Sequence, residues 1–204
     1  QKAVAELTQL NIAFEFGENS EKVLNAYVVV LSPGVPNDAP IVKQAVAREL
    51  RLVAEIEAAS WFCKGPIVAI TGTNGKTTTT TLTGRIFEDA RKPNVVAGNI
   101  GVAFSEVVER TNENTTAILE VSSFQLDTVD SFHPKVSALL NITPDHLDRY
   151  EHSLDKYVAS KCRVFENQQA GDAIVYNYDD EIVRAAVENR VSSAVKKLPF
   201  STKQ

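Results

Sequence analysis

The 204-residue sequence predicts an α/β fold with a mostly parallel sheet, and two observations support this prediction. Short apolar, β-branched runs recur along the chain, and segments with a helical pattern lie between several of them. Strands that alternate with helices are typical of parallel sheets, because each helix carries the chain back to the starting edge. Hydrophobic residues make up 44% of the chain and charged residues 23%, which is typical of a globular protein with a real core.

The expected elements follow from these runs in chain order. Strands are expected at Ile12–Phe16, Tyr27–Leu31, Pro66–Thr71, Asn94–Ala97, Thr116–Val121, Val136–Asn141 and Asp172–Tyr176. Helices are expected at Pro40–Glu49, Glu55–Phe62, Lys76–Ala90, Leu154–Glu166 and Glu181–Asn189. Their alternation is clearest after residue 65, where we expect the sheet.

A domain boundary is predicted near the Lys64-Gly65-Pro66 segment, whose composition is typical of a linker. We interpret residues 1–64 as an incomplete Rossmann-like N-terminal domain. Residues 65–204 are interpreted as an incomplete central domain of the P-loop ATPase type. The chain begins with Gln and contains no Met, so we expect it to be part of a longer polypeptide.

Composition argues against several classes of protein. The net charge of -5 argues against a nucleic-acid binder, which usually carries a basic face. No apolar run reaches the ~18 residues of a membrane span, and the N-terminus lacks a signal pattern. Cys63 and Cys162 lie far apart and lack metal-ligand spacing, so we expect no disulfide framework and a cytoplasmic location. We also expect a monomer.

The stretch TGTNGKTTTT at residues 71–80 predicts a phosphate-binding loop between a strand and a helix. Only two residues separate Gly72 from Gly75, whereas the common P-loop has four in that interval. Glycines let the backbone approach phosphates, and the helix N-terminus offers N–H groups to an anion. Lys76 would reach the β- and γ-phosphates, and the Thr77 hydroxyl would bind Mg²⁺. The alternative is an ordinary turn before a threonine-rich helix. The predicted ATP-binding set is Gly72, Thr73, Asn74, Gly75, Lys76, Thr77 and Thr78.

With its two-residue gap, TGTNGKTTT resembles the loop of the Mur ligases and folylpolyglutamate synthases. Further motifs of that family occur in the right order along essentially the whole chain: LSPGVP (31–36), GNIG (98–101), LEVSSFQLD (119–127), NITPDHLDRY (141–150) and YVASKCRVFEN (157–167). The resemblance implies an ATP-dependent amide-bond ligase of peptidoglycan precursor synthesis. The implied reaction adds D-glutamate to UDP-N-acetylmuramoyl-L-alanine through an acyl phosphate, and residues 1–204 alone are expected to be inactive.

Two alternatives stay open at this point. One is a nucleotide-binding switch that uses ATP binding without ligation. The other is a ligase of the same family that takes another amino acid or a folate.

The metal-binding and catalytic residues are implied by this resemblance. Glu120 ends the apolar run TAILEV, where it could face water, but the resemblance implies a Mg²⁺ ligand. His146 could be a loop histidine bonded to the backbone, and the resemblance implies that it helps to bind a second Mg²⁺. Lys161 alone would be read as a solvated helical lysine. The resemblance instead implies that CO₂ carbamylates it into an anionic metal ligand. Catalytic roles are thus expected for Lys76, Lys161 and His146, and metal ligation for Thr77, Glu120, His146 and Lys161.

Substrate-binding residues are implied in the same way. The resemblance points to Asn99, Ser122, Ser123 and Gln125 as contacts for substrate or ATP phosphate. It also implies that Ser32, Pro33 and Gly34 bind the uridine-diphosphate end of the substrate. A plain turn would explain Gly98-Asn99 equally well. Arg149 could contact an anionic group or form a surface ion pair.

Overall fold

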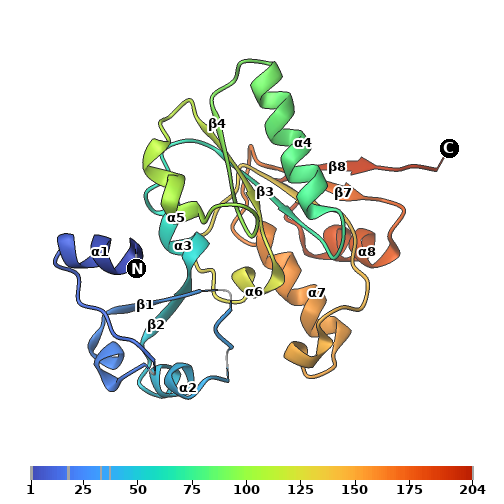
Figure 1. Cartoon of the computed structure of the whole chain (residues 1–204). Coiled ribbons are helices and arrows are strands. Elements are labelled where there is room, and N and C mark those ends of the chain that lie inside the picture. Colours follow the sequence, from blue (N-terminus) through green and yellow to red (C-terminus); the bar gives the residue numbers. More distant parts are fainter. Residues whose placement is uncertain (1, 18, 33, 37, 204) are drawn as a thin grey trace. The chain divides into compact units, whose positions relative to one another are not determined.

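The computed structural model of the chain describes residues 2–17, 19–32, 34–36 and 38–203 (Figure 1). The chain divides into two compact units, Gln1–Leu52 and Val53–Gln204. This division falls before the boundary expected at 64/65. Helix α3 (Glu55–Ser60) belongs to the second unit, because its buried Glu57 carboxylate accepts hydrogen bonds from the backbone N–H groups of Asp130 and Phe132 at 3.0 and 2.7 Å.

Strand β1 (Val28–Leu31) of the first unit pairs with β2 (Arg51–Ala54) in a small two-stranded sheet, and the division after Leu52 falls within β2. The helices of the first unit are α1 (Lys2–Gln9), η1 (Glu21–Asn25) and α2 (Pro40–Ala47). The structure confirms the expected strand at 27–31 and the helix at 40–49. Neither α1 nor β2 was expected from the sequence.

The strand expected at Ile12–Phe16 is wrong, because these residues lie in no helix or strand. A strand needs a neighbour for its backbone N–H and C=O groups. In the part of the chain that the structure describes, no strand pairs with this run. Ile12 and Phe16 are 49% and 76% exposed, so their apolar side chains do not enter a core either.

The second unit follows the expected alternation of strands and helices. After α3 its elements are β3 (Ile67–Thr71), α4 (Lys76–Asp89), β4 (Asn94–Gly98), α5 (Phe104–Val107), η2 (Val108–Arg110), β5 (Thr116–Glu120), α6 (Ser123–Leu126), β6 (Val136–Leu139), η3 (Leu147–Tyr150), α7 (Leu154–Cys162), η4 (Arg163–Phe165), β7 (Ala173–Asn177), α8 (Glu181–Arg190) and β8 (Lys196–Phe200). Every strand and helix expected after residue 54 is confirmed, and β8 is an additional strand. None of the helices in the described ranges is both long and apolar enough to span a membrane.

The strands of the second unit form one six-stranded sheet in the order β4-β5-β3-β6-β7-β8. All neighbouring pairs run parallel, which confirms the predicted α/β class. Strand β3 pairs with β5 on one side and with β6 on the other. The strand order therefore reverses at β3, because β4 and β5 lie on one side of it and β6 to β8 lie on the other. Ligands of such sheets bind beyond the carboxyl ends of the strands at this reversal. The glycine loop, defined as Gly72–Gly75, follows β3 at that point (Figure 1).

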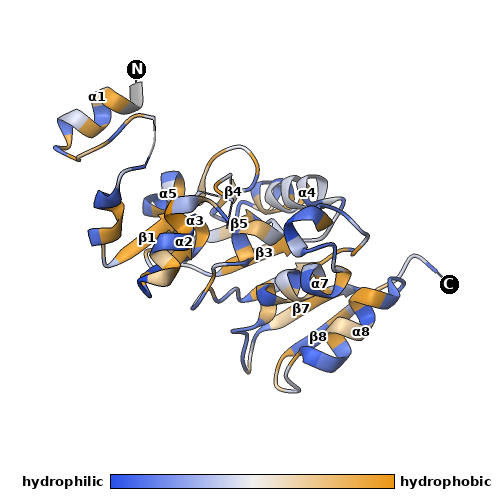
Figure 2. Ribbon diagram, turned by 90° about the horizontal axis from the view of Figure 1, so that it is seen from below, coloured by the Kyte–Doolittle hydropathy of each residue, from blue (hydrophilic) through white to orange (hydrophobic). Residues whose placement is uncertain are grey.

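Alternate strand residues supply two cores, one on each face of the sheet. Ile70, Ile118 and Ala138 pack with Phe87 of α4, whereas residues such as Leu119 of β5 face a larger core shared with α3 and α5–α8. In Figure 2 the central strands are accordingly hydrophobic, and the helices carry hydrophilic outer surfaces.

Gly84 brings α4 close to β4. A Cβ at this position would lie 2.4 Å from Cγ2 of Val96, so only glycine allows this contact. A glycine inside a helix ordinarily costs about 1 kcal/mol, and here the close packing offsets that loss. Helix α4 is thereby held against the sheet, with its first turn at the glycine loop.

Candidate phosphate-binding site

The glycine loop needs both of its glycines. Gly75 has a φ of 82° and caps the N-terminus of α4, and Gly72 has a φ of 153°. A Cβ on Gly72 would approach the Leu140 Cβ to 3.0 Å. The first N–H groups of α4 have no partner within the helix and carry the positive end of its dipole. The loop therefore has the backbone conformation and the charge that suit an anion.

The segment after β6 holds the glycine loop in shape. Asn141 accepts from the Thr73 N–H through its carbonyl oxygen at 2.9 Å and from the Asn74 N–H through Oδ1 at 2.8 Å. Its Nδ2 donates back to the Asn74 carbonyl at 2.9 Å. The Thr143 N–H donates to Thr73 Oγ1 at 3.0 Å. Asn141 was not predicted as a site residue, because its signal in the sequence is no more than a polar amide at the end of an apolar strand.

Two lysines meet at the glycine loop. Lys76 Nζ donates to the carbonyls of Gly72 and Thr73 at 2.9 and 2.7 Å. Lys161 Nζ, from α7, donates to the same Gly72 carbonyl at 2.9 Å. The Lys161 side chain also lies over the Tyr157 ring, 4.6 Å from its centroid, and the Tyr157 hydroxyl is 3.2 Å from Thr73 Oγ1. Lysines from two helices thus share one carbonyl oxygen.

Lys161 is 1% exposed, so the alternative of a solvated helical lysine is excluded. Burial and the neighbouring Lys76 charge lower the pKa of Lys161 from 10.5 to about 7. Both causes disfavour the ammonium form, and near neutral pH a substantial fraction of the side chain is the neutral, nucleophilic amine.

A second cluster surrounds Glu120 at the carboxyl end of β5. Glu120 is 2% exposed, which rules out the alternative that it faces water. Thr77 Oγ1 donates to Glu120 Oε2 at 2.8 Å, and Asn99 Nδ2 donates to Oε1 at 2.7 Å. Both donors are neutral, so neither of them compensates the carboxylate charge. A carboxylate and a hydroxyl beside a phosphate loop are oxygen ligands of the kind that Mg²⁺ takes, so these residues fit the ion.

The GNIG loop packs on the backbone of Glu120. Asn99 N–H donates to the Glu120 carbonyl at 2.9 Å. Gly98 has a φ of 108°, and a Cβ there would lie 2.3 Å from the Glu120 carbonyl oxygen. The Gly98-Asn99 pair therefore forms a turn and also fixes the orientation of the buried Glu120 carboxylate.

Gly98→Ala should lower the free energy of unfolding by about 2–3 kcal/mol, because alanine combines a strained φ with a backbone clash. Urea denaturation of the chain measures this difference. Gly34→Ala is the matched control, since a Cβ at Gly34 would meet nothing within 4 Å. Equal midpoints for the two variants would contradict the described contact.

His146 stands apart from these clusters. It has a left-handed backbone with φ of 49°, and its side chain is 59% exposed. Its ring lies 5.4 Å from the Phe124 ring, and Nε2 is 3.6 Å from Asp145 Oδ2. Across the described ranges, no group of three His, Cys, Asp or Glu residues is placed to hold a metal. The structure thus brings Thr77 and Glu120 together but does not join His146 to them.

The SSFQL segment forms a capped helix start rather than a free set of side chains. Ser122 Oγ accepts from the Gln125 N–H, and Gln125 Oε1 accepts from the Ser122 N–H at 3.0 Å. Ser123 and Gln125 are buried, and the Ser123 carbonyl accepts from Ser160 Oγ at 2.9 Å. Substrate contacts by Ser122, Ser123 and Gln125 stay predictions, and local capping accounts for part of the motif.

The remaining predicted residues are placed as follows. Thr78 is exposed in the first turn of α4. Arg149 lies 4.0 Å from the centroid of the Phe124 ring. Ser32 and Gly34 belong to the first unit, and Pro33 lies outside the described residues.

A parallel sheet with a strand–glycine loop–helix unit at its reversal point, next to a buried strand-end carboxylate, defines a phosphate-binding α/β protein of the P-loop type. Residues 70–204 match the model of the Mur ligase middle domain. The chain therefore belongs to the Mur ligase family.

Curated relatives are similar over most of the chain. A UDP-N-acetylmuramoylalanine–D-glutamate ligase of Salinibacter ruber is 53% identical over 191 residues, covering 91% of this chain and 42% of the relative. A ligase of the same name from Chloroherpeton thalassium is 47% identical over 204 residues, covering 97% of this chain and 44% of the relative. The chain thus spans less than half the length of these relatives.

Solved structures show the same fold at low identity. A UDP-N-acetylmuramate:L-alanyl-γ-D-glutamyl-meso-diaminopimelate ligase of Neisseria has a TM-score of 0.63 and 18% identity, with 95% of this chain and 65% of that chain covered. A UDP-N-acetylmuramate–alanine ligase of Thermotoga maritima has a TM-score of 0.56 and 21% identity, with 100% and 45% covered. At these identities the likeness concerns the fold alone.

Proposed function

We propose that this chain supplies the nucleotide-binding part of an ATP-dependent ligase that joins D-glutamate to UDP-N-acetylmuramoyl-L-alanine during peptidoglycan precursor synthesis. The observation that supports it most is the convergence of Lys76, Lys161 and the Thr77–Glu120 pair on one glycine loop. The substrate assignment is supported by the names of the relatives that are 47–53% identical. A cytoplasmic, monomeric enzyme with two small-molecule substrates besides ATP completes the proposal.

The first chemical step requires two anions to approach each other. The alanyl carboxylate attacks the γ-phosphorus of ATP, the bond to the β-phosphate oxygen breaks, and acyl phosphate and ADP result. Lys76 and the N–H groups at the start of α4 stabilise the negative charge that spreads over the transferred group. The amine of D-glutamate then attacks the acyl carbon, phosphate leaves with the bonding electrons, and the nitrogen releases a proton to solvent. The chain needs no covalent nucleophile of its own for either step.

Two magnesium ions form part of the proposal. Thr77 and Glu120 would hold the first ion, and His146 with a modified Lys161 would contribute to the second. Bound Mg²⁺ supplies Lewis-acid neutralisation of the phosphate oxygens.

The modification of Lys161 follows from its partly neutral amine. The nitrogen lone pair attacks the carbon of CO₂, one C=O electron pair moves onto oxygen, and a proton leaves to solvent. The product is a carbamate anion, so a residue that repels a cation becomes one that attracts it.

The reaction is tested by phosphate release from a chimera in which residues 1–204 replace the matching segment of the Salinibacter ruber relative. We expect phosphate release with UDP-N-acetylmuramoyl-L-alanine and D-glutamate, and none when L-lysine or meso-diaminopimelate replaces D-glutamate. Release that is indifferent to the amino acid would overturn the ligase and favour a nucleotide switch. Release with another amino acid alone would overturn the assigned substrate.

Glu120→Gln should raise the Mg²⁺ concentration needed for half-maximal ATP binding by about 10- to 100-fold, because the amide keeps the shape but loses the charge. A fluorescent ATP analogue titrated with Mg²⁺ measures this shift in the chain itself. Glu113→Gln is the matched control, because Glu113 is an exposed glutamate just before β5. An unchanged magnesium midpoint for Glu120→Gln would remove Glu120 from the metal site.

A further inference from the structure

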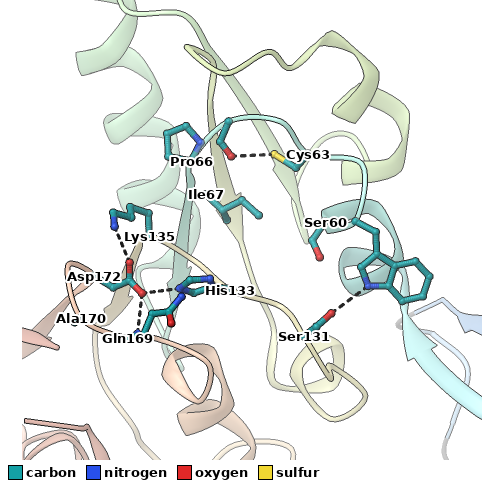
Figure 3. A pocket seen from close by; sticks show the side chains of 12 residues that line it. Ser60, Cys63, Pro66, Ile67, Ser131, His133, Lys135, Gln169, Ala170 and Asp172 are labelled. Atoms are coloured by element: carbon teal, nitrogen blue, oxygen red, sulfur yellow. Dashed lines mark hydrogen bonds and ion pairs between the residues drawn. The ribbon is translucent and has the colours of Figure 1, made fainter. Parts of the chain in front are cut away.

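A pocket of about 430 Å³ opens at the amino ends of the strands (Figure 3), whereas the glycine loop lies at their carboxyl ends. Ile67 begins β3, Lys135 directly precedes β6 and Asp172 directly precedes β7, so the lining comes from the amino ends of three neighbouring strands. Strand β3 has five residues, so the amino and carboxyl ends of the strands lie roughly 16 Å apart. The pocket is therefore a different site from the one that holds Lys76 and Glu120.

A buried carboxylate organises one wall of this pocket. Asp172 is 1% exposed, and its oxygens lie 2.9 Å from Lys135 Nζ and 2.5 Å from His133 Nε2. The Gln169 N–H donates to the same carboxylate at 2.8 Å. Burial alone would raise the pKa of Asp172, but the hydrogen bonds from His133, Gln169 and Lys135 outweigh it and lower the pKa to about 2. Asp172 is thus fully charged and already has partners on both oxygens.

Lys135 and His133 are more accessible from the pocket than Asp172 is. The Lys135 and His133 side chains are 54% and 36% exposed, whereas Asp172 lies behind them. Both bases keep polar capacity after pairing, since the Lys135 ammonium has three N–H groups and the His133 ring has a second nitrogen besides Nε2. Figure 3 shows both bases on one side of the pocket, with Ser60 and Ser131 on the other.

The size of the pocket suits a small molecule. Ligand pockets typically measure about 300–1,000 Å³ and combine apolar walls with a few convergent polar groups. Here Pro66 and Ile67 supply apolar surface beside the bases. A purely structural role for Asp172, in which it joins the start of β6 to the start of β7, would require only one cationic partner. It would not require an open pocket beside the carboxylate.

We propose that this pocket binds a small oxyanion, a phosphate or carboxylate group, with Lys135 and His133 as its anchors and Asp172 as the residue that orients both. Asp172 is a positioning residue, because the bases stand between it and the ligand. The site is independent of the proposed ligase reaction.

The chain contains three histidines, which gives a local readout. The 1–204 chain is prepared with ¹³C-labelled histidine, and the His133 ring signal is assigned with His133→Gln. Inorganic phosphate and acetate are then titrated separately at constant pH and ionic strength. We expect a saturable His133 shift with at least one probe, half-complete at about 1 mM, and the stronger probe identifies the oxyanion class. Phosphate bound at the glycine loop does not shift the His133 signal, because the loop lies at the carboxyl ends of the strands.

Lys135→Met should abolish the saturable shift, and Lys135→Arg should retain it. Lys92→Met, at an exposed lysine before β4, is the matched control and should bind as the parent does. Unmoved His146 and His152 signals in Lys135→Met show that the fold survives. A His133 signal that moves with neither probe, or that moves equally in Lys135→Met, overturns the proposal.

Discussion

Lys76→Ala weakens ATP binding by about 10- to 100-fold in the chain, because each hydrogen bond to a charged group contributes about 1.5–3 kcal/mol. In the chimera, phosphate release falls by about 10²- to 10³-fold, the size expected when one preorganised charge is removed from the transferring phosphoryl group. The ammonium already lies across the glycine loop, bonded to the Gly72 and Thr73 carbonyls. It therefore meets a bound phosphate without a large rearrangement.

A fluorescent nucleotide titration measures the affinity, and the phosphate-release assay measures the rate. Lys92→Ala, at an exposed lysine just after α4, is the control and should leave both unchanged. Lys76→Arg should recover part of the binding, since it keeps the charge but not the compact shape of the ammonium. If Lys76→Ala binds ATP within twofold of the parent, the glycine loop is not the triphosphate site.

Lys161→Met makes the chain more stable while removing a proposed functional group. A buried ammonium that is replaced by an apolar chain of similar length typically stabilises a protein by about 1–4 kcal/mol. Because the pKa of Lys161 is lowered from 10.5 to about 7, the unfolded chain holds a proton between these values that the folded chain has released. The stability of the parent therefore rises with pH from about 7 to 10.5, and below pH 7 the full penalty of burying the charge is present.

The gain from Lys161→Met is accordingly largest below pH 7 and shrinks as the pH approaches 10.5. Urea denaturation in CO₂-free buffer at several pH values measures it. Lys156→Met is the matched control on the same helix, and it should change stability by less than about 0.5 kcal/mol because Lys156 is half exposed. A parent whose stability is flat from pH 7 to 10 would contradict the buried, neutral lysine.

Strands β3 to β7 and helices α3, α4, α7 and α8 could be predicted because each has a long enough pattern and clear breaks, whereas the four-residue helices α5 and α6 were not predicted. Strand β8 could not be predicted, since KKLPF carries two lysines and Pro199. These are residues typical of an edge strand, and its burial pattern is mostly exposed. The opposite error occurred at 12–16, where an apolar run has no partner in the described chain.

The candidate site was predictable only in part. The glycine loop could be recognised from Gly-Lys-Thr between an apolar strand and a helix, because backbone conformation and helix start are local properties. Burial of Lys161 is not local, since it depends on α7 packing against a loop 89 residues earlier. Asn141 was missed for the same reason, as its partners lie 67 residues away.

That distance between Asn141 and the glycine loop has a consequence for biosynthesis. A ribosome that has released only the first ninety residues has already made the whole TGTNGKTTT motif. The groups that shape it, at Asn141 and Thr143, have not yet been translated. Contacts of such long sequence separation form late, after the intervening strands have assembled. We therefore expect affinity for nucleotide only when β6 docks beside β3, so that a nucleotide stabilises chains translated beyond Thr143 and not shorter ones.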